Sequence, residues 1–319
     1  MTKKPVLALV SSAFVLTVGI GAAVGDEVWV TNMKAGNVQV IDPEAMTVGA
    51  TIPADAGAHN VTFSRDGNWA LIANVGADNV TIIDAQAKEV VGTVPAGPRA
   101  HEVSVSPDGK LAAASNVGAD YVTVIDVAKG EPVNDVTTAD GAMMSVFSDD
   151  GSTLYVANAG AATVSVVDIA TGEVTGELPG GAGMMAFIPG SDWSTAWGTA
   201  PAENKIFMLD LAKGEKAKEI EVDGEPHGMV MSPDGATIYV VQRELNQVAK
   251  VDPESGEVVA TAAVGQRPDM LAISPDGAHL FVTSRDENKL LKLSTSDLSV
   301  VDEVETAEEP HGVAYRPTS

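Results

Sequence analysis

The sequence predicts an all-β fold built from seven repeated units, and three observations support this prediction. The pattern Ser-Pro-Asp-Gly, or a variant of it, returns along the chain, and the first strands of the units start at positions 59, 101, 143, 184, 227, 269 and 311. Each period holds four apolar runs bounded by Gly, Asp or Pro, which leaves no room for helices. Residues 26–319 also make up seven periods of 42 residues. A period of 40 to 45 residues with four strands indicates a seven-bladed β-propeller with four-stranded blades.

One copy, Glu225–Gln242, shows the elements of a unit in order. A short apolar run around Val230 is followed by a turn, Ser232–Gly235, and then by a second β-branched run. Proline at the second turn position fixes φ, and Asp-Gly tolerates turn conformations that other residues resist. This copy therefore predicts the inner strand, the tight turn and the second strand of a blade.

The two chain ends predict how the ring closes. Residues 27–32, 37–42 and 48–52 match the second, third and fourth strands of a unit, without a first strand before them. The C-terminal segment 311–317 matches a first strand without the other three. We expect the N-terminal strands to pair with this C-terminal inner strand, which removes two open sheet edges.

Residues 1–25 differ from the repeats and indicate a signal peptide. Lys3 and Lys4 precede an apolar stretch, and Ala23-Val24-Gly25 forms a small-residue cleavage site. An uncleaved anchor is the alternative, because the apolar stretch is close to the lower limit for a membrane span. We therefore expect a signal peptide at 1–25, a propeller domain at 26–319, a periplasmic or extracellular location, and no membrane span after cleavage.

Charge and cysteine content limit the possible partners. Lys and Arg number 19 against 44 Asp and Glu, a formal net charge of −25, and there is no cysteine. Such an acidic chain is not expected to bind nucleic acid or anionic lipid. The acids fit either a solvated surface or a cationic protein partner. Stability must come from packing and ring closure, since no disulfide can form.

The repeats resemble a known family. Tyr155-Val-Ala-Asn158, the following Val-Ser-Val-Val-Asp run, the turn Thr171-Gly172-Glu173 and the Ser-Pro-Asp-Gly motif are similar to those of YVTN-type β-propeller repeat proteins. The resemblance covers residues 26–319 and implies an exported seven-bladed propeller. Propellers of nitrite reductases belong to the same architectural group. The resemblance implies no single activity, because its members range from surface scaffolds to cofactor binders.

One repeat position gathers the candidate metal ligands. It lies five residues before the Ser of each turn and holds His59, His101, Met143, Met184, His227, Asp269 and His311. Inner strands line the central axis of a propeller, so these residues should form a ring at one mouth of the channel. Four of the five histidines of the chain occupy this position. The exception, His279, is expected at the surface.

The residue types of this ring predict a bound metal. Imidazole and thioether without thiolate suit copper, and thioether favours Cu(I). Haem iron with His and Met axial ligands is the alternative cofactor. A small organic ligand, or polar residues facing a water-filled funnel with methionines as packing, remain open.

Arginines near the same mouth are candidate cofactor-binding residues. They are Arg99, Arg243, Arg267 and Arg285. Guanidinium groups can hold an anionic ligand in bidentate fashion. Ion pairing with Glu244 and Asp286 is an equally good interpretation.

Three function classes follow from these features. The first is an exported protein that binds a metal, copper before haem, at a His/Met ring. The seven-bladed propellers of nitrous oxide reductase, where axial histidines hold copper, and of haem-d1 nitrite reductases use the same mouth, which is an analogy of architecture and residue type. The second is an interaction scaffold without a cofactor. The third is a lactonase-like or dehydrogenase-like enzyme acting on a small anionic substrate, with Glu102 and His101 as an acid–base pair. The chain has no Gly-x-Ser-x-Gly, no cysteine nucleophile and no Cys-x-x-Cys-His motif, so catalytic residues stay unassigned.

Overall fold

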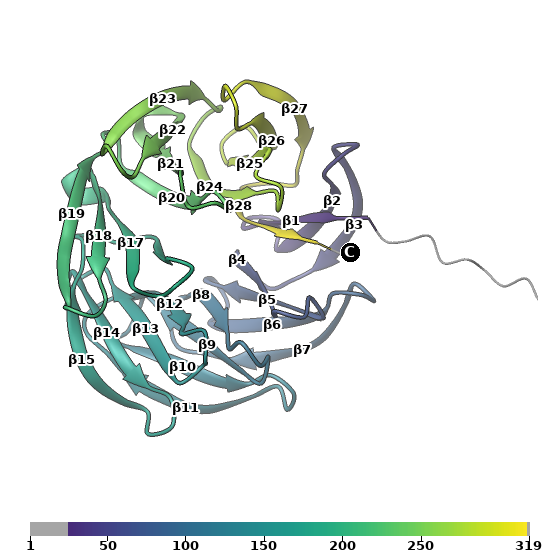
Figure 1. The fold of residues 1–319 in the computed structure, drawn as a ribbon. Helices are drawn as coiled ribbons and strands as arrows, with labels where there is room; N and C mark the ends of the chain where they lie inside the picture. The colour runs from purple at the N-terminus through teal and green to yellow at the C-terminus, as the bar shows by residue number, and fades with distance from the viewer. Residues whose placement is uncertain (1–24, 318–319) are drawn as a thin grey trace, which may run out of the picture.

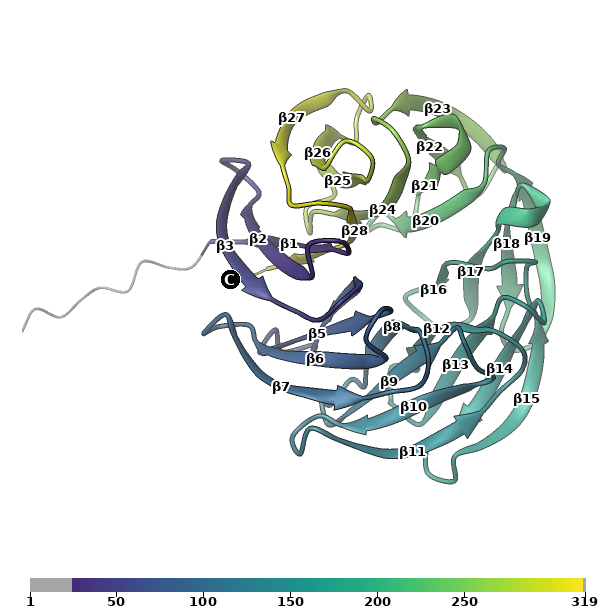
Figure 2. The same cartoon turned by 180° about the vertical axis from the view of Figure 1, so that it is seen from behind.

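The computed structural model describes residues 25–317, and they form seven four-stranded antiparallel sheets arranged as a ring (Figure 1). The chain is a seven-bladed β-propeller, as the repeat predicts. The inner strands of successive blades contact one another around the axis, and the last of them returns to the first blade. Figure 2 shows the same ring from behind. Among residues 25–317, no helix is long and apolar enough to cross a membrane. The predicted signal peptide lies almost wholly outside the described residues.

The blades are numbered from the one that holds both chain ends, and each is given from its inner to its outer strand. Blade 1 contains β28 (Pro310–Arg316), β1 (Glu27–Asn32), β2 (Asn37–Asp42) and β3 (Thr47–Pro53). Blade 2 contains β4 (Ala58–Phe63), β5 (Trp69–Asn74), β6 (Asn79–Asp84) and β7 (Glu89–Pro95). Blade 3 contains β8 (Ala100–Val105), β9 (Leu111–Asn116), β10 (Tyr121–Asp126) and β11 (Glu131–Thr137). Blade 4 contains β12 (Ala142–Phe147), β13 (Thr153–Asn158), β14 (Thr163–Asp168) and β15 (Glu173–Pro179).

The remaining blades follow the same order. Blade 5 contains β16 (Phe187–Pro189), β17 (Thr195–Ala200), β18 (Lys205–Asp210) and β19 (Glu215–Glu221). Blade 6 contains β20 (Pro226–Met231), β21 (Ile238–Gln242), β22 (Gln247–Asp252) and β23 (Glu257–Ala263). Blade 7 contains β24 (Pro268–Ile273), β25 (His279–Ser284), β26 (Lys289–Ser294) and β27 (Val300–Glu305). Two single 3-10 turns, η1 (Pro201–Glu203) and η2 (Arg243–Leu245), follow the second strands of blades 5 and 6.

The expected closure is present in blade 1. The C-terminal β28 pairs with β1 antiparallel, with Val30 opposite Val313. A buried lysine adds a second link across the seam, since Lys292 Nζ of blade 7 donates to the Pro43 carbonyl of blade 1 at 2.8 Å. The two chain ends therefore complete one sheet and leave blade 1 with no open inner edge.

The turn motif acts as the sequence predicts in the five blades 2, 3, 4, 6 and 7 and differs in one position of blade 5, while blade 1 joins its first two strands only by pairing of the chain ends. In blade 6, Ser232 Oγ donates to Asp234 Oδ1 at 2.6 Å, and Gly235 adopts φ 71°. The corresponding position in blade 5 holds Trp193, which adopts φ 56° and stacks on Tyr155 of blade 4 at 5.8 Å. Trp193 thus lies in the turn before β17. Only Trp197 lies within that strand.

The core lies between the blades, because each sheet packs one face on each neighbour. Between blades 1 and 2, for example, Trp29, Val40 and Ile52 pack against Val61 and Ile72. Side chains on both faces of a strand are therefore buried, which explains why the inner three strands of each blade are nearly continuous apolar runs. This packing fixes the inner strands and, with them, the groups that line the axis.

Candidate functional site

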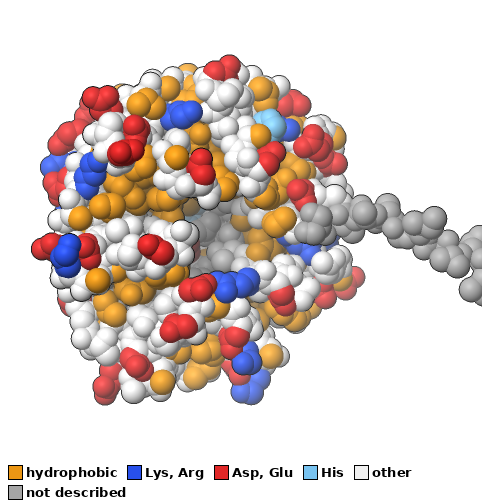
Figure 3. All heavy atoms as spheres, viewed as in Figure 1, with side chains coloured by type: hydrophobic (Ala, Val, Ile, Leu, Met, Phe, Trp, Pro, Cys, Tyr) orange, Lys and Arg blue, Asp and Glu red, His pale blue; other side chains and the backbone are white. Residues whose placement is uncertain are grey.

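The ring position is left out of the regular strand pairing in several blades. In blade 2 the register of β4 against β5 shifts between Ala58 and Asn60, so His59 has no cross-strand partner. The same shift in blade 3 excludes His101. A β-bulge redirects a side chain and frees its backbone carbonyl for other contacts. The start of each inner strand can thus aim its side chain at the axis of the ring. Figure 3 shows that the molecule is hollowed at the centre of the ring on the face in view.

Three histidines of adjacent blades are joined through these free carbonyls. His59 Nδ1 lies 2.9 Å from the His101 carbonyl oxygen, and His311 Nδ1 lies 3.0 Å from the His59 carbonyl oxygen. His101 Nδ1 makes the same contact with Met143 of blade 4, at 3.1 Å. A carbonyl oxygen only accepts, so each Nδ1 carries the hydrogen and each neutral ring keeps a lone pair on Nε2. The fold therefore fixes one tautomer at all three positions.

The three imidazoles are packed together and uncharged. The ring centroid of His59 lies 4.0 Å from that of His101 and 3.7 Å from that of His311. Burial removes the rings from water and lowers the pKa of His101 to about 3 and that of His311 to about 4. Burial likewise holds the pKa of His59 well below its usual value. Among residues 25–317, Nε2 of His59 and of His101 has no hydrogen-bond partner.

His227 has a different environment on the other side of the ring. Its Nε2 lies 2.5 Å from Nη2 of Arg243, which donates to it. Its Nδ1 is buried and has no partner among the described residues. Burial, followed by the nearby Arg243 charge, holds the pKa of His227 well below its usual value. His227 therefore accepts from an arginine and does not join the three-histidine group through a backbone carbonyl.

Asp269 is the charged centre of blades 6, 7 and 1. Its side chain is fully buried, and its two oxygens lie 2.6 Å from Arg243 Nη2 and 3.4 Å from Arg285 Nη1. Nε2 of His311 lies 3.8 Å from Asp269 Oδ2. The sequence placed Asp269 in the ring position without a role. The arginines that the sequence placed near the same mouth were the signal for a charged network around Asp269.

The predicted arginines divide into two pairs. Arg243 and Arg285 lie in the network, where each also contacts a rim carboxylate, Glu225 and Glu309 respectively, at 3.1 Å. Arg267 is half exposed and lies 4.0 Å from Asp286. Arg99 is exposed, and its backbone N–H donates to Asp78. The structure therefore brings only two of the four arginines together, and ion pairing occupies both of them.

The two ring methionines lie in different places. Met143 is buried beside the histidine group, with its carbonyl accepting from His101. Met184 is fully buried in a core cluster with Phe187 and Phe207. Its sulfur fills the space above Gly198, where a Cβ atom would lie 3.1 Å from it. Met184 is thus a packing residue of blade 5 and stands apart from the three imidazoles.

Glu102 follows His101 on β8 and is a partly buried acid. Burial raises the pKa of its carboxyl to about 8, and no hydrogen bond to that carboxyl exists among residues 25–317. The carboxyl is therefore protonated at neutral pH. The sequence indicated Glu102 only through its position beside His101.

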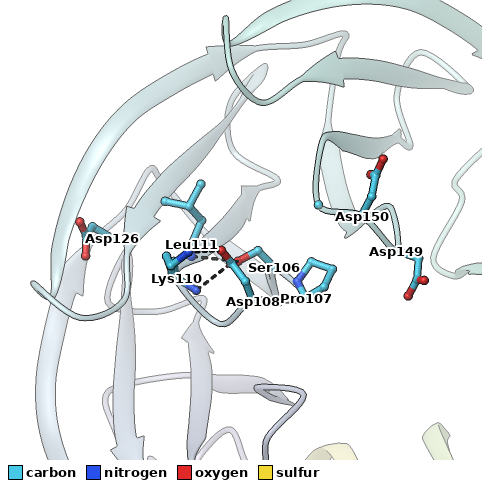
Figure 4. Close-up of a pocket in the computed structure, with 9 residues that line it drawn as sticks. Ser106, Pro107, Asp108, Lys110, Leu111, Asp126, Asp149 and Asp150 are labelled. Carbon is cyan, nitrogen blue, oxygen red and sulfur yellow. Dashed lines mark hydrogen bonds and ion pairs between the residues drawn. The ribbon is translucent and has the colours of Figure 1, made fainter.

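A second concave region lies at the other end of the inner strands. The groove in Figure 4 has a volume of about 600 Å³ and lies between the turns of blades 3 and 4. Its carboxylates serve the turns, since Asp108 accepts from Ser106 Oγ and from Lys110 Nζ, both at 2.8 Å. Asp150 likewise accepts from Ser148 and Ser152. These internal contacts account for the acids of the groove.

Comparison with known proteins relates the first blades to a haem-binding domain. Residues 23–149 match the family model of the cytochrome D1 heme domain. This segment holds His59, His101 and Glu102, and it is less than half of the chain. No curated protein matches the sequence.

Solved structures share the fold across nearly the whole chain. Kuenenia stuttgartiensis hydrazine synthase is 21% identical, with a TM-score of 0.77 over 90% of this chain and 100% of that chain. The Pseudomonas aeruginosa periplasmic gluconolactonase is 18% identical, with a TM-score of 0.78 over 92% and 99%. The dihydro-heme d1 dehydrogenase NirN is 16% identical, with a TM-score of 0.69 over 90% of this chain and 74% of that chain. At these identities the likeness shows the fold alone.

Proposed function

We propose that the protein binds a metal cofactor at the channel mouth and that the cofactor is of the haem type. The observation that carries this proposal is the group of His59, His101 and His311. Three neutral imidazoles lie on adjacent blades, and each Nδ1 is held by a backbone carbonyl, which leaves the Nε2 lone pairs as the donor atoms. A hydrogen bond from Nδ1 to a backbone carbonyl orients a histidine ligand toward a metal at Nε2.

The residues fit an iron cofactor by their donor chemistry. Neutral imidazole is a common axial ligand of haem iron, and a lowered pKa keeps the Nε2 lone pair available without proton competition near pH 7. The match of residues 23–149 to the cytochrome D1 heme domain supports a haem over a bare ion. When bound, a haem would supply redox chemistry or a coordination site for a small molecule. The role of the chain is then to hold the ligand rings and to limit access of water to them.

Copper finds less support in the structure than in the sequence. The preference for Cu(I) depended on thioether ligands, and Met184 lies in the core of blade 5. The remaining set of imidazole nitrogens is compatible with copper, zinc or iron and does not select Cu(I). A metal-loaded protein containing copper without haem would restore the sequence prediction.

A second candidate function is an enzyme that acts on a small molecule in the channel. The observation that favours it is Glu102, an acid held neutral at pH 7 beside a neutral histidine. A protonated carboxyl and an imidazole lone pair form a possible general acid and general base. The fold of the periplasmic gluconolactonase is compatible with this candidate and does not assign a substrate.

The protein recovered from its native host tests the main proposal. We propose that it is exported, so it should be purified from the periplasmic or extracellular fraction. We expect a haem-type absorption spectrum and iron by elemental mass spectrometry. Colourless protein without stoichiometric metal would favour the scaffold or the enzyme.

A further inference from the structure

A second group of potential metal ligands lies outside the three-histidine group. His227, Asp269 and His311 are all buried, and one ligand atom from each lies within 4.8 Å of the other two. They come from β20, β24 and β28, the inner strands of blades 6, 7 and 1. Nδ1 of His311 is held by a carbonyl, so Nε2 is its free donor. Two imidazole nitrogens and a carboxylate form a common ligand set for divalent first-row metals.

The guanidinium of Arg243 already occupies the cation position of this group. Its Nη2 lies 2.5 Å from His227 Nε2 and 2.6 Å from Asp269 Oδ1. A metal ion bound by these same two atoms would need the place that the guanidinium takes. A metal ion beside this positive charge would be strongly repelled in a buried site. The arginine and a divalent cation therefore exclude each other.

Arg243 also contacts a carboxylate nearer the solvent in the same conformation. Its Nη1 lies 3.1 Å from Glu225, a rim residue whose side chain is 32% exposed. Asp269 would keep Arg285 at 3.4 Å if Arg243 moved outward. Departure of Arg243 from Asp269 would therefore leave neither the guanidinium nor the Asp269 carboxylate without a charged partner.

We propose that His227, Asp269 and His311 form a divalent-cation site that Arg243 guards. A divalent metal enters when the Arg243 side chain moves from His227 and Asp269 to the rim at Glu225. The site is distinct from the proposed haem position except for His311. The proposed site does not require a bound haem, because its three ligands and Arg243 contact one another directly.

Cobalt titration of metal-free and haem-free protein tests the proposal. Co²⁺ is a suitable probe because its visible absorption reports coordination by protein ligands. Arg243→Met removes the charge and keeps most of the stem, so it should bind Co²⁺ at least about tenfold more tightly than the unaltered protein. Adding Asp269→Asn to Arg243→Met should abolish the gain. If Arg243→Met does not fold, Arg243→Gln replaces it.

Arg285→Met is the matched control. Arg285 contacts the same Asp269 from a longer distance and does not contact His227, so its loss should tighten Co²⁺ binding much less than the loss of Arg243. An equal gain in both arginine variants, or no gain in Arg243→Met, would overturn the proposal. A His59→Ala/His101→Ala change in the Arg243→Met background should leave the gain intact. That result separates this site from the proposed haem position, whatever the outcome of the haem experiments.

Discussion

Glu27 and Arg316 form a buried ion pair that joins the two ends of the folded chain. Arg316 Nη1 lies 2.9 Å from Glu27 Oε2, and their side chains are 2% and 6% exposed. Arg316 also donates to the Gly67 carbonyl of blade 2, at 3.0 Å. Burial alone would raise the pKa of Glu27, but hydrogen bonds from Lys88, Trp29 and Arg316 lower it below its usual value. The stabilisation from this carboxylate is therefore lost only as the pH falls through that lowered pKa.

Arg316→Ala should destabilise the ring strongly. It leaves Glu27 buried with Lys88 as its remaining charged partner at 2.7 Å. Removing one partner of a buried pair costs about 3–5 kcal/mol, and the remaining lysine places this case near about 3 kcal/mol. Urea unfolding measures the change. Arg65→Ala is the control, because Arg65 and Asp149 form an exposed pair whose loss should cost less than about 1 kcal/mol.

Deletion of residues 311–319 should be far more damaging than loss of an ordinary tail. It removes nearly all of β28, which is the inner strand of blade 1 and carries His311 and Arg316. The inner edge of β1 would then be open, and the inner strands of blades 2 and 7 would lose their packing against β28. Thermal unfolding should show a large drop in Tm or an unfolded protein. A truncated chain melting within a few degrees of the full-length chain would contradict the closure.

Met184 should matter for stability and not for cofactor binding. Met184→Ala leaves a cavity beside Phe207 and should cost about 2–5 kcal/mol. Met184→Leu keeps the volume and should cost less than about 1.5 kcal/mol. Metal content and the visible spectrum of Met184→Leu should equal those of the unaltered protein. Loss of the bound metal in this variant would return Met184 to the ligand set.

Glu102 should make stability depend on pH in a defined direction. The folded pKa of about 8 exceeds the ordinary value of 4.5, so between these values the folded state keeps a proton that the unfolded chain releases. Stability should therefore fall as pH rises across this window, with a slope of up to about 1.4 kcal/mol per pH unit. Glu102→Gln carries no such proton and should lose this slope. Urea midpoints from pH 5 to pH 8 measure it, and parallel curves for both proteins would refute the assignment.

The repeat made the fold predictable, because period, turn residues and strand pattern agree in nearly every unit. The same register predicted that His59, His101 and His311 would meet, since equivalent positions of adjacent blades must face one axis. Met184 could not be placed this way, because its side chain fills the space left by Gly198 of its own blade. The sequence also did not predict that Arg243 contacts His227 and Asp269. Aligning the repeats shows which residues occupy equivalent positions around the axis. It does not show that a long side chain such as Arg243 reaches Asp269 on the next blade.

The tautomers at the ring could not be predicted either. They depend on the backbone carbonyls of the next blade, which the bulges free from strand pairing. These contacts are properties of the assembled ring. Because of these contacts, the rings of His59, His101 and His311 each carry their lone pair on Nε2 in a fixed orientation.

Titration of the cofactor-free protein with ferric protoporphyrin IX tests the central claim most directly. The unaltered protein and His279→Ala, a histidine outside the ring, should bind one equivalent with a shifted Soret band. His59→Ala/His101→Ala should remain folded and lose at least about 100-fold in affinity together with the shift. Equal affinity and an unchanged spectrum in the double variant would contradict ligation by these histidines.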